Sequence, residues 1–354
     1  MQPVRKRIEV GVLGATGMVG QQFVRQLARH PWFRPAWLAA SERSEGRTYA
    51  DAAPWRLSEA PPDEIRGTIV EGCVPGRGPQ LMFSALDATA AKDIEPAFAA
   101  AGHLVVSNAR CYRMDADVPL LIPEVNADHL ALLDRQRQAR GWRGAIVTNP
   151  NCSTVVLAMV LAPLRRFGLE SVLVSTMQAV SGAGYPGVSS MDILGNVVPF
   201  IANEEEKIES ETCKILGSLG GGAVTPHAVT VSAHTNRVPV IDGHTETVSI
   251  RLTARPSLDE VRDALAGFKG QPQALGLPTA PPHPLVVSAA PDRPQPRRDV
   301  ERDGGMTVTV GRIRPCPVLG LKLVALGHNT IRGAAGAAVL NAELMLATGL
   351  IGED

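Results

Sequence analysis

The sequence lacks the features that mark metal-binding, disulfide-stapled and membrane-spanning proteins. Its 354 residues include only five cysteines, with no Cys-x-x-Cys pair and no Cys/His cluster. This pattern indicates no zinc site, and a disulfide framework is not expected in a chain this long, so we expect no metal and a reducing, cytoplasmic compartment. No apolar run has the length of a membrane span, and the basic N-terminus does not resemble a signal peptide.

An excess of charge of one sign is also missing. The chain has 35 basic and 35 acidic residues, so its formal net charge is zero. A nucleic-acid partner is therefore not indicated, because binding to a polyanion depends on clustered positive charge. A neutral chain repels copies of itself only weakly, which leaves homo-oligomers open.

The first 150 residues alternate short apolar runs with helical patterns. At about 100–200 residues per domain, the length suggests two domains. Alternating strands and helices predict an α/β fold whose N-terminal part is a Rossmann-like, doubly wound parallel sheet. The predicted strands are 8–15, 35–41, 68–72, 81–86, 104–109 and 145–149, and helices are predicted at 18–30 and 87–102.

After Cys152 the pattern changes to longer strands, several of which alternate polar and apolar residues. This predicts an α+β catalytic and dimerisation domain with a mixed sheet, one face of which is solvated or packed against a partner. We expect residues 1–151 to form a cofactor-binding domain completed by a C-terminal helix within 330–354, and residues 152–329 to form the second domain. The predicted strands are 171–182, 228–240, 244–254, 306–314 and 320–329, with a mainly helical stretch at 192–217 and a proline-rich surface loop at 271–299.

The first predicted strand ends in a glycine-rich turn, Gly14-Ala-Thr-Gly17-Met-Val-Gly20. Glycine lets the backbone approach a pyrophosphate, and the helix that follows presents free N–H groups to it. A plain strand-to-helix turn would have the same local pattern, but the position in a βαβ unit favours a dinucleotide.

The second strand ends in Ser41-Glu42-Arg43-Ser44, which bears on the choice between NAD and NADP. Glu42 could bind the ribose hydroxyl of NAD. Arg43 between two serines suits the 2′-phosphate of NADP better, so we expect NADP.

Cys152 lies between a predicted strand and the apolar run STVVLAMVLAPL. At a helix N-terminus the dipole lowers the pKa of a thiol and favours the nucleophilic thiolate. Packing is the alternative role for a lone cysteine, although a structural cysteine would more naturally lie inside the apolar run.

Four further segments carry residues suited to thiol chemistry. His244 follows a tight turn and could exchange a proton with the sulfur, and Arg237 could bind a carboxylate. Gln178 precedes a glycine-rich loop. Glu204 and Lys207 share one helix face, a pair that is also typical of a solvated surface.

Together these segments resemble aspartate-β-semialdehyde dehydrogenase, in the branch typical of archaea and fungi. The match runs in order from about residue 7 to 345. It rests on GATGMVG, LAASERS, NPNCST, STMQAVSGAG, NEEEKIESET, HTNRVPVIDGH and GHNTIRGAAG.

The resemblance implies NADPH-dependent reduction of L-aspartyl-4-phosphate to aspartate semialdehyde and phosphate, on the route to lysine, threonine and methionine. It implies Cys152 as nucleophile, His244 as acid/base and Gln178 as the residue that orients the acyl group. Arg237 and Glu204 would bind the substrate's carboxylate and amine. The phosphate would be bound by Lys207, Asn151 and Arg113, of which Arg113 follows Cys111 and Tyr112 where this branch more often has Asn-His. The implied cofactor-binding residues are Gly14, Thr16, Gly17, Met18, Val19, Ser41, Arg43, Ser44, Ser84, Ser181, Gly182 and Asn329.

Other functions stay open at this level. Malonyl-CoA and succinyl-CoA reductases would use the same cysteine chemistry, and N-acetylglutamyl-phosphate reductase is a more distant alternative. A non-catalytic NADP-binding redox sensor belongs to a different class, but such a protein would not need all four of Cys152, Gln178, Arg237 and His244. We expect a small-molecule substrate and a homodimer or homotetramer.

Overall fold

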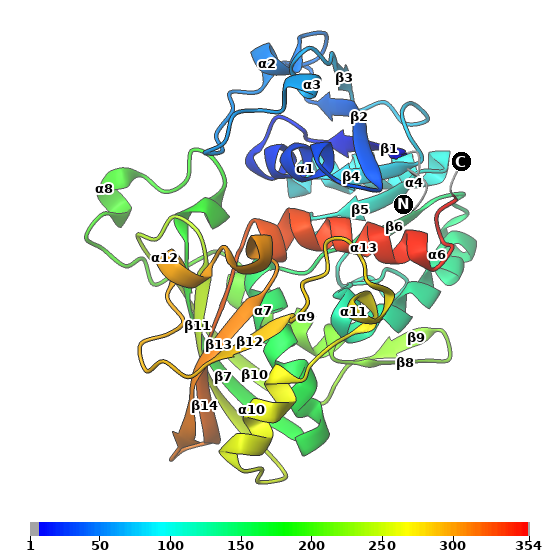
Figure 1. The fold of residues 1–354 in the computed structure, drawn as a ribbon. Coiled ribbons are helices and arrows are strands. Elements are labelled where there is room, and N and C mark those ends of the chain that lie inside the picture. Colours follow the sequence, from blue (N-terminus) through cyan, green and yellow to red (C-terminus); the bar gives the residue numbers. More distant parts are fainter. Residues whose placement is uncertain (1–6, 353–354) are drawn as a thin grey trace, which may run out of the picture.

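The computed structural model describes residues 7–352 as two sheets with a long helix between them (Figure 1). The first six and last two residues, which belong to the predicted ranges 1–151 and 330–354, lie outside the described residues, as does part of the N-terminal segment considered for a signal peptide. No helix within 7–352 is both long and apolar enough to cross a membrane.

The N-terminal sheet is parallel throughout, with the strand order β3-β2-β1-β4-β5-β6. Val10 and Val12 pack on the side covered by α1 and α13, while Leu13 packs on the opposite side with Phe98 of α4. The predicted doubly wound sheet is therefore confirmed. Its strands are β1 (Ile8–Leu13), β2 (Phe33–Ala40), β3 (Val70–Gly72), β4 (Leu81–Ser84), β5 (Leu104–Ser107) and β6 (Ala145–Thr148), and its helices are α1 (Met18–Ala28), α2 (Tyr49–Ala52), α3 (Asp63–Arg66), α4 (Ala88–Ala101), α5 (Pro123–Asn126) and α6 (Leu132–Arg140).

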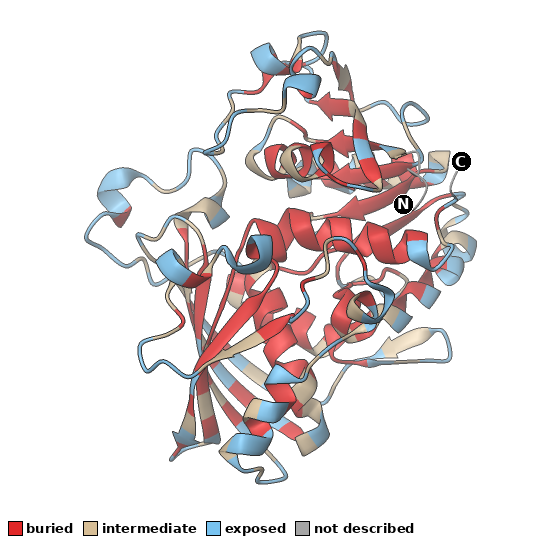
Figure 2. Cartoon of the chain, in the orientation of Figure 1, coloured by how far each residue is buried: buried red, intermediate tan, exposed pale blue. Residues whose placement is uncertain are grey.

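The second sheet is mixed, with the strand order β10-β7-β11-β14-β13-β12. Two of its strand pairs are parallel and three are antiparallel. Val174 and Val248 are buried on the helix-covered face, whereas Leu173 and Thr247 on the other face are exposed (Figure 2). The strands are β7 (Leu169–Gln178), β10 (Thr230–Arg237), β11 (His244–Leu252), β12 (Leu285–Ser288), β13 (Val308–Cys316) and β14 (Gly320–Gly327), and the helices α7 (Cys152–Leu161), α9 (Glu204–Ile215) and α10 (Leu258–Ala266) accompany them; β8 (Ser218–Gly220) and β9 (Ala223–Thr225) form a separate hairpin.

The stretch 192–217 is mainly helical, as predicted, but it is interrupted: α8 (Ser190–Ile193) ends early, Gly195 adopts a left-handed φ of 68°, and α9 begins only at Glu204. Glycine in this conformation and Pro199 both interrupt helical hydrogen bonding. The range 271–299 is not only a loop, because it contains α11 (Gln271–Leu275), α12 (Pro296–Asp299) and strand β12, which pairs in parallel with β13.

The C-terminal segment returns to the first sheet. A π turn (Ile331–Ala335) leads into α13 (Gly336–Ala347), whose residues Val339 and Leu344 belong to the same core as β1. Arg332 at this turn is fully buried, and its Nη1 and Nη2 donate to the two oxygens of Glu124 in α5 at 2.8 and 2.7 Å. A bidentate ion pair thus fixes the start of α13.

We predict that breaking this pair destabilises the fold strongly. In Glu124→Leu an uncompensated guanidinium stays buried, which should lower the free energy of unfolding by about 3–5 kcal/mol. The double variant Glu124→Leu/Arg332→Met buries no charge and should cost less than Glu124→Leu alone. Urea unfolding curves measure both, and a cost below about 1 kcal/mol for the single variant would contradict a structural role for the pair.

Candidate active site

Cys152 is the first residue of α7, where the sequence predicts a helix N-terminus. Asn151 caps this helix, because its side-chain oxygen accepts hydrogen bonds from the backbone N–H groups of Ser153 and Thr154 at 3.0 and 3.1 Å. The cap satisfies two of the N–H groups that a helix start leaves open. It also fixes the turn that carries the sulfur.

Three predicted residues lie together at one end of the second sheet. Arg237 ends β10, Gln178 ends β7 and His244 begins β11, and these strands are neighbours in the order β10-β7-β11. Arg237 and Gln178 are paired in register, and β11 runs antiparallel to β7. All three side chains are buried.

The sulfur of Cys152 lies 3.2 Å from Nε2 of His244. On the other side of the ring, the backbone N–H of Ala179 donates to Nδ1 at 3.1 Å. A neutral imidazole carries one N–H, so an acceptor at Nδ1 leaves the hydrogen on Nε2, directed at the sulfur. His244 is therefore arranged to donate a hydrogen bond to Cys152.

Burial keeps this pair neutral. It raises the pKa of the Cys152 thiol to about 12, with a further rise from Glu204, although Arg113, Arg237 and Lys207 oppose the rise. Burial also lowers the pKa of His244 to about 3, and the positive charge of Arg237 adds to this effect. The expectation of a resting thiolate was therefore wrong, because desolvation outweighs the favourable charges around the sulfur.

Gly182 lets a loop pass close to this group. A Cβ at this position would lie 2.9 Å from Nη1 of Arg237 and 3.1 Å from the ring of His244. The same Nη1 donates to the carbonyl of Ala179 at 2.7 Å. Gln178 donates through Nε2 to Thr176 at 3.3 Å, so its side chain is also held.

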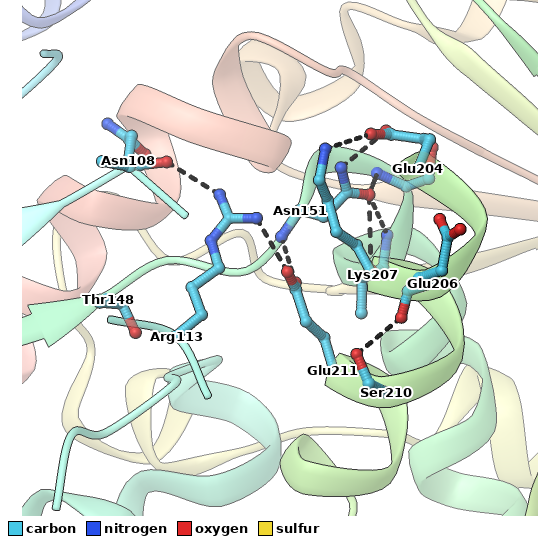
Figure 3. Close-up of polar contacts among 12 residues, drawn as sticks. Asn108, Arg113, Thr148, Asn151, Glu204, Glu206, Lys207, Ser210 and Glu211 are labelled. Atoms are coloured by element: carbon cyan, nitrogen blue, oxygen red, sulfur yellow. Dashed lines mark hydrogen bonds and ion pairs between the residues drawn. The ribbon is translucent and has the colours of Figure 1, made fainter. Parts of the chain in front are cut away.

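Glu204 is buried, in contrast to the solvated surface that its sequence pattern also allows. Its two oxygens accept from Asn151 Nδ2 at 2.6 Å and from Lys207 Nζ at 2.9 Å (Figure 3). Burial would raise the pKa of Glu204, but Lys207 and Asn151 outweigh it and the pKa is lowered. The carboxylate is therefore charged at neutral pH.

Arg113 approaches the Asn151 turn from the N-terminal half of the chain. Its Nη1 donates to Glu211 at 2.9 Å and its Nη2 to the carbonyl of Asn108 at 2.8 Å. Its buried Nε has no partner among the described residues. The structure thus places Arg113 near Asn151 and Lys207, the other two residues that the resemblance implies for the phosphate (Figure 3).

The glycine turn has the geometry of a phosphate-binding loop. Gly14 has a left-handed φ of 73°, and a Cβ there would lie 2.7 Å from the carbonyl oxygen of Ala85. Gly17 is exposed at the N-terminus of α1 and offers no side-chain cap, so the first-turn N–H groups are free for a ligand. Thr16, Met18 and Val19 are half-exposed beside it.

The residues predicted to bind the 2′-phosphate of NADP differ in how far they are exposed to solvent. Ser41 and Arg43 are exposed just after β2, and a hydrogen bond from Ala15 N to Ala39 O holds β2 beside the glycine turn. Ser44 is buried, and Ser84 is buried completely.

Asn329 connects two loops of the site. Its Nδ2 donates to Ser181 at 2.8 Å, and its Oδ1 accepts from the backbone N–H of Gly243, the residue before His244. Sequence reasoning missed Gly333, where a Cβ would lie 2.6 Å from that of Cys152. The small-residue run GAAG in the C-terminal segment is the signal that could have indicated this close contact.

Comparison with known proteins identifies the family of this chain. The family model for the semialdehyde dehydrogenase NAD binding domain matches residues 9–133, and the model for the semialdehyde dehydrogenase dimerisation domain matches residues 161–332. Aspartate-semialdehyde dehydrogenases from Methanothermobacter thermautotrophicus and Archaeoglobus fulgidus are 52% and 50% identical, each over 96% of this chain and 99% and 98% of their own lengths. The chain belongs to the aspartate-semialdehyde dehydrogenase family.

A solved member of the aspartate-semialdehyde dehydrogenase family has the same fold. The crystal structure of the Candida albicans enzyme with NADP superimposes with a TM-score of 0.90 at 43% identity, covering 98% of this chain and 100% of that one. The resemblance to archaeal and fungal members of the family is therefore confirmed, and so is the two-part α/β fold.

We predict that alkylation of Cys152 in the empty enzyme is slow and rises about tenfold per pH unit between pH 7 and 9, because only the thiolate reacts. Glu204→Gln removes a negative charge, should lower the pKa of Cys152 and should speed the reaction about three- to tenfold at fixed pH. Arg237→Gln should slow it. Iodoacetamide labelling read by peptide mass spectrometry measures these rates, with the exposed Glu206→Gln as control. A rate independent of pH above 7 would contradict the raised pKa.

Proposed function

We propose that this chain interconverts L-aspartyl-4-phosphate and L-aspartate 4-semialdehyde with NADP(H) and phosphate, through a thioester on Cys152. The observation that carries the proposal is the sulfur at the N-terminus of α7, 3.2 Å from an imidazole nitrogen that bears its hydrogen. This arrangement combines a nucleophile with a group that can stabilise its anion and return a proton.

The covalent steps follow from this pair. In the direction of reduction, the thiol of Cys152 loses its proton as its sulfur attacks the acyl carbon, the bond to the phosphate oxygen breaks, and phosphate leaves with the bonding electrons and that proton. NADPH, when bound, would supply the hydride that reduces the thioester carbon. The carbon–sulfur bond then breaks, Nε2–H of His244 donates to the departing sulfur, and a proton taken up from solvent restores the neutral imidazole and thiol. Gln178 would orient the acyl group beside it.

Opposite charges suit the two ends of an amino acid substrate. Arg237 uses one N–H on the carbonyl of Ala179, and its other N–H groups have no partner among the described residues, so it can bind a carboxylate. Glu204 is charged and could bind the amine. This two-sided arrangement supports an amino acid over a CoA thioester, which needs only one carboxylate-binding group.

Arg113, Lys207 and Asn151 would bind the phosphate. They converge on the start of α7, where the helix N-terminus favours an anion. The unpartnered Nε of Arg113 leaves a donor for an incoming oxygen.

The glycine turn Gly14–Gly17 and the first turn of α1, including Thr16, Met18 and Val19, would hold the pyrophosphate of NADP. Exposed Ser41 and Arg43 would bind its 2′-phosphate, with Ser44 at the base of that turn. Ser181, Gly182, Asn329 and the end of β4 at Ser84 would line the nicotinamide side. A cofactor-binding part within 7–151, completed by α13, and a catalytic part within 152–329 fit this division.

We also propose a cytoplasmic homodimer or homotetramer. The match to a dimerisation domain and the uncovered face of the second sheet, with exposed Leu173 and Thr247, support assembly through that face. Five free cysteines suit a reducing compartment.

The enzyme should form NADPH from aspartate semialdehyde, phosphate and NADP. Cys152→Ala should lose at least about a thousandfold in kcat, because no other group forms the thioester. Cys316→Ala, at the far end of β13, serves as control. Normal activity in Cys152→Ala would refute the mechanism. If the enzyme turned over malonyl-CoA or succinyl-CoA with NADPH faster than aspartate semialdehyde with NADP, its substrate would be an acyl-CoA and not the one proposed.

Cofactor choice is tested at the end of β2. Arg43→Ala should raise KM for NADP by about tenfold and leave KM for NAD nearly unchanged, because only NADP presents a 2′-phosphate. The neighbouring Glu42→Gln should affect neither strongly. Equal losses with both cofactors in Arg43→Ala would remove Arg43 from this role.

A further inference from the structure

Helix α9 carries four charged residues at the spacing of a single helix face: Glu204, Lys207, Glu211 and Lys214. Figure 3 shows Glu204, Lys207 and Glu211 beside Asn151 and Arg113. The first two belong to the proposed substrate site. Glu211 and Lys214 are farther along the helix, and both are almost completely buried.

Glu211 joins the two sides of the phosphate site with one carboxylate. Its Oε1 accepts from Nη1 of Arg113 at 2.9 Å, and its Oε2 accepts from the backbone N–H of Asn151 at 2.6 Å. Asn151 is the residue before Cys152. A single side chain therefore sets the position of the cation relative to the turn that carries the nucleophile.

Lys214 fixes the chain segment that carries Arg113. Its ammonium donates to three backbone carbonyls, those of Arg113 at 2.7 Å, Asp115 at 2.7 Å and Val118 at 2.9 Å. No carboxylate accepts a hydrogen bond from it within the described residues. The three donors match three converging acceptors, so Lys214 holds the loop through its backbone, in addition to the hydrogen bonds that the Asp115 and Asp117 side chains accept from Arg140.

The negative charge of Glu211 also compensates the buried positive charge of Arg113. Arg113 is buried, and an unpaired guanidinium would be costly there without the carboxylate beside it. The remaining donors of Arg113 stay available, because its Nε has no partner. The carboxylate of Glu211 thus holds the guanidinium of Arg113 in place, and Nε of Arg113 remains as a hydrogen-bond donor for an anion.

We propose that Glu211 and Lys214 are positioning residues for phosphate, which hold Arg113 and the Asn151–Cys152 turn at the spacing that the anion needs. The inference rests on the proposed function, in which phosphate is a substrate. Neither residue touches the reacting atoms.

The test measures three Michaelis constants in the direction that consumes phosphate. Glu211→Gln places an amide N–H₂ against one of its two donors and should raise KM for phosphate by about tenfold or more, while KM for the aldehyde and for NADP stay within about twofold. Lys214→Met should do the same. The matched controls are Glu206→Gln on the exposed face of α9 and the exposed Lys269→Met, which should leave all three constants unchanged.

Calorimetric titration of each folded variant with inorganic phosphate gives a readout apart from turnover and should show the same loss of affinity. If Glu211→Gln does not fold, Glu211→Asp keeps the charge but is too short to reach both donors, and it should show the same selective rise. An unchanged KM for phosphate, or a parallel rise in all three constants, would overturn the positioning role. A wild-type enzyme that forms many equivalents of NADPH per active site without phosphate would instead refute the proposed function, because the thioester alone accounts for only one.

Discussion

The contact between the sulfur of Cys152 and Nε2 of His244 is the interaction on which the site depends. Hydrogen bonds and strand pairing from different parts of the chain produce it. Asn151 caps α7 and fixes the turn before the sulfur, while the N–H of Ala179 holds Nδ1 and so directs the ring's hydrogen at the sulfur. The antiparallel pairing of β11 with β7 brings His244 beside Gln178. Because these constraints come from the fold itself, the contact does not require a substrate to form.

The thiol and the imidazole at the centre of the site are neutral, and charged side chains surround them. Burial keeps Cys152 and His244 neutral, although Arg113, Arg237 and Lys207 all favour a thiolate. A substrate that binds to these cations and displaces water changes both the desolvation of the thiol and the charges around it. The pKa of Cys152, and with it the reactivity of the sulfur, therefore depends on the bound ligand. A free thiolate would be exposed to oxidation between turnovers, which a neutral thiol resists.

Local sequence patterns predicted those helices and strands whose formation depends mainly on residues close together in the chain. The start of α7 at Cys152, the start of β11 at His244 and the parallel sheet all follow from apolar runs, turns and caps. The sequence could not predict that burial would raise the pKa of Cys152, because desolvation depends on atoms brought from distant segments. It also missed Glu211, whose partners are Arg113 and Asn151, and Lys214, which binds the carbonyls of Arg113, Asp115 and Val118, because these partners lie 60 to 101 residues away in the sequence. The mainly helical stretch at 192–217 was predicted, but not its interruption at Gly195, which adopts a left-handed φ of 68°.

The most direct test of the account is to trap the acyl group on the enzyme. Wild-type protein would be mixed with aspartate semialdehyde and NADP without phosphate, quenched in acid and digested, and its cysteine peptides would be weighed by mass spectrometry. The account predicts an aspartyl thioester on the peptide that contains Cys152, which disappears when phosphate is added before the quench. Formation of NADPH with no adduct on that peptide, or with the adduct on another cysteine, would contradict it.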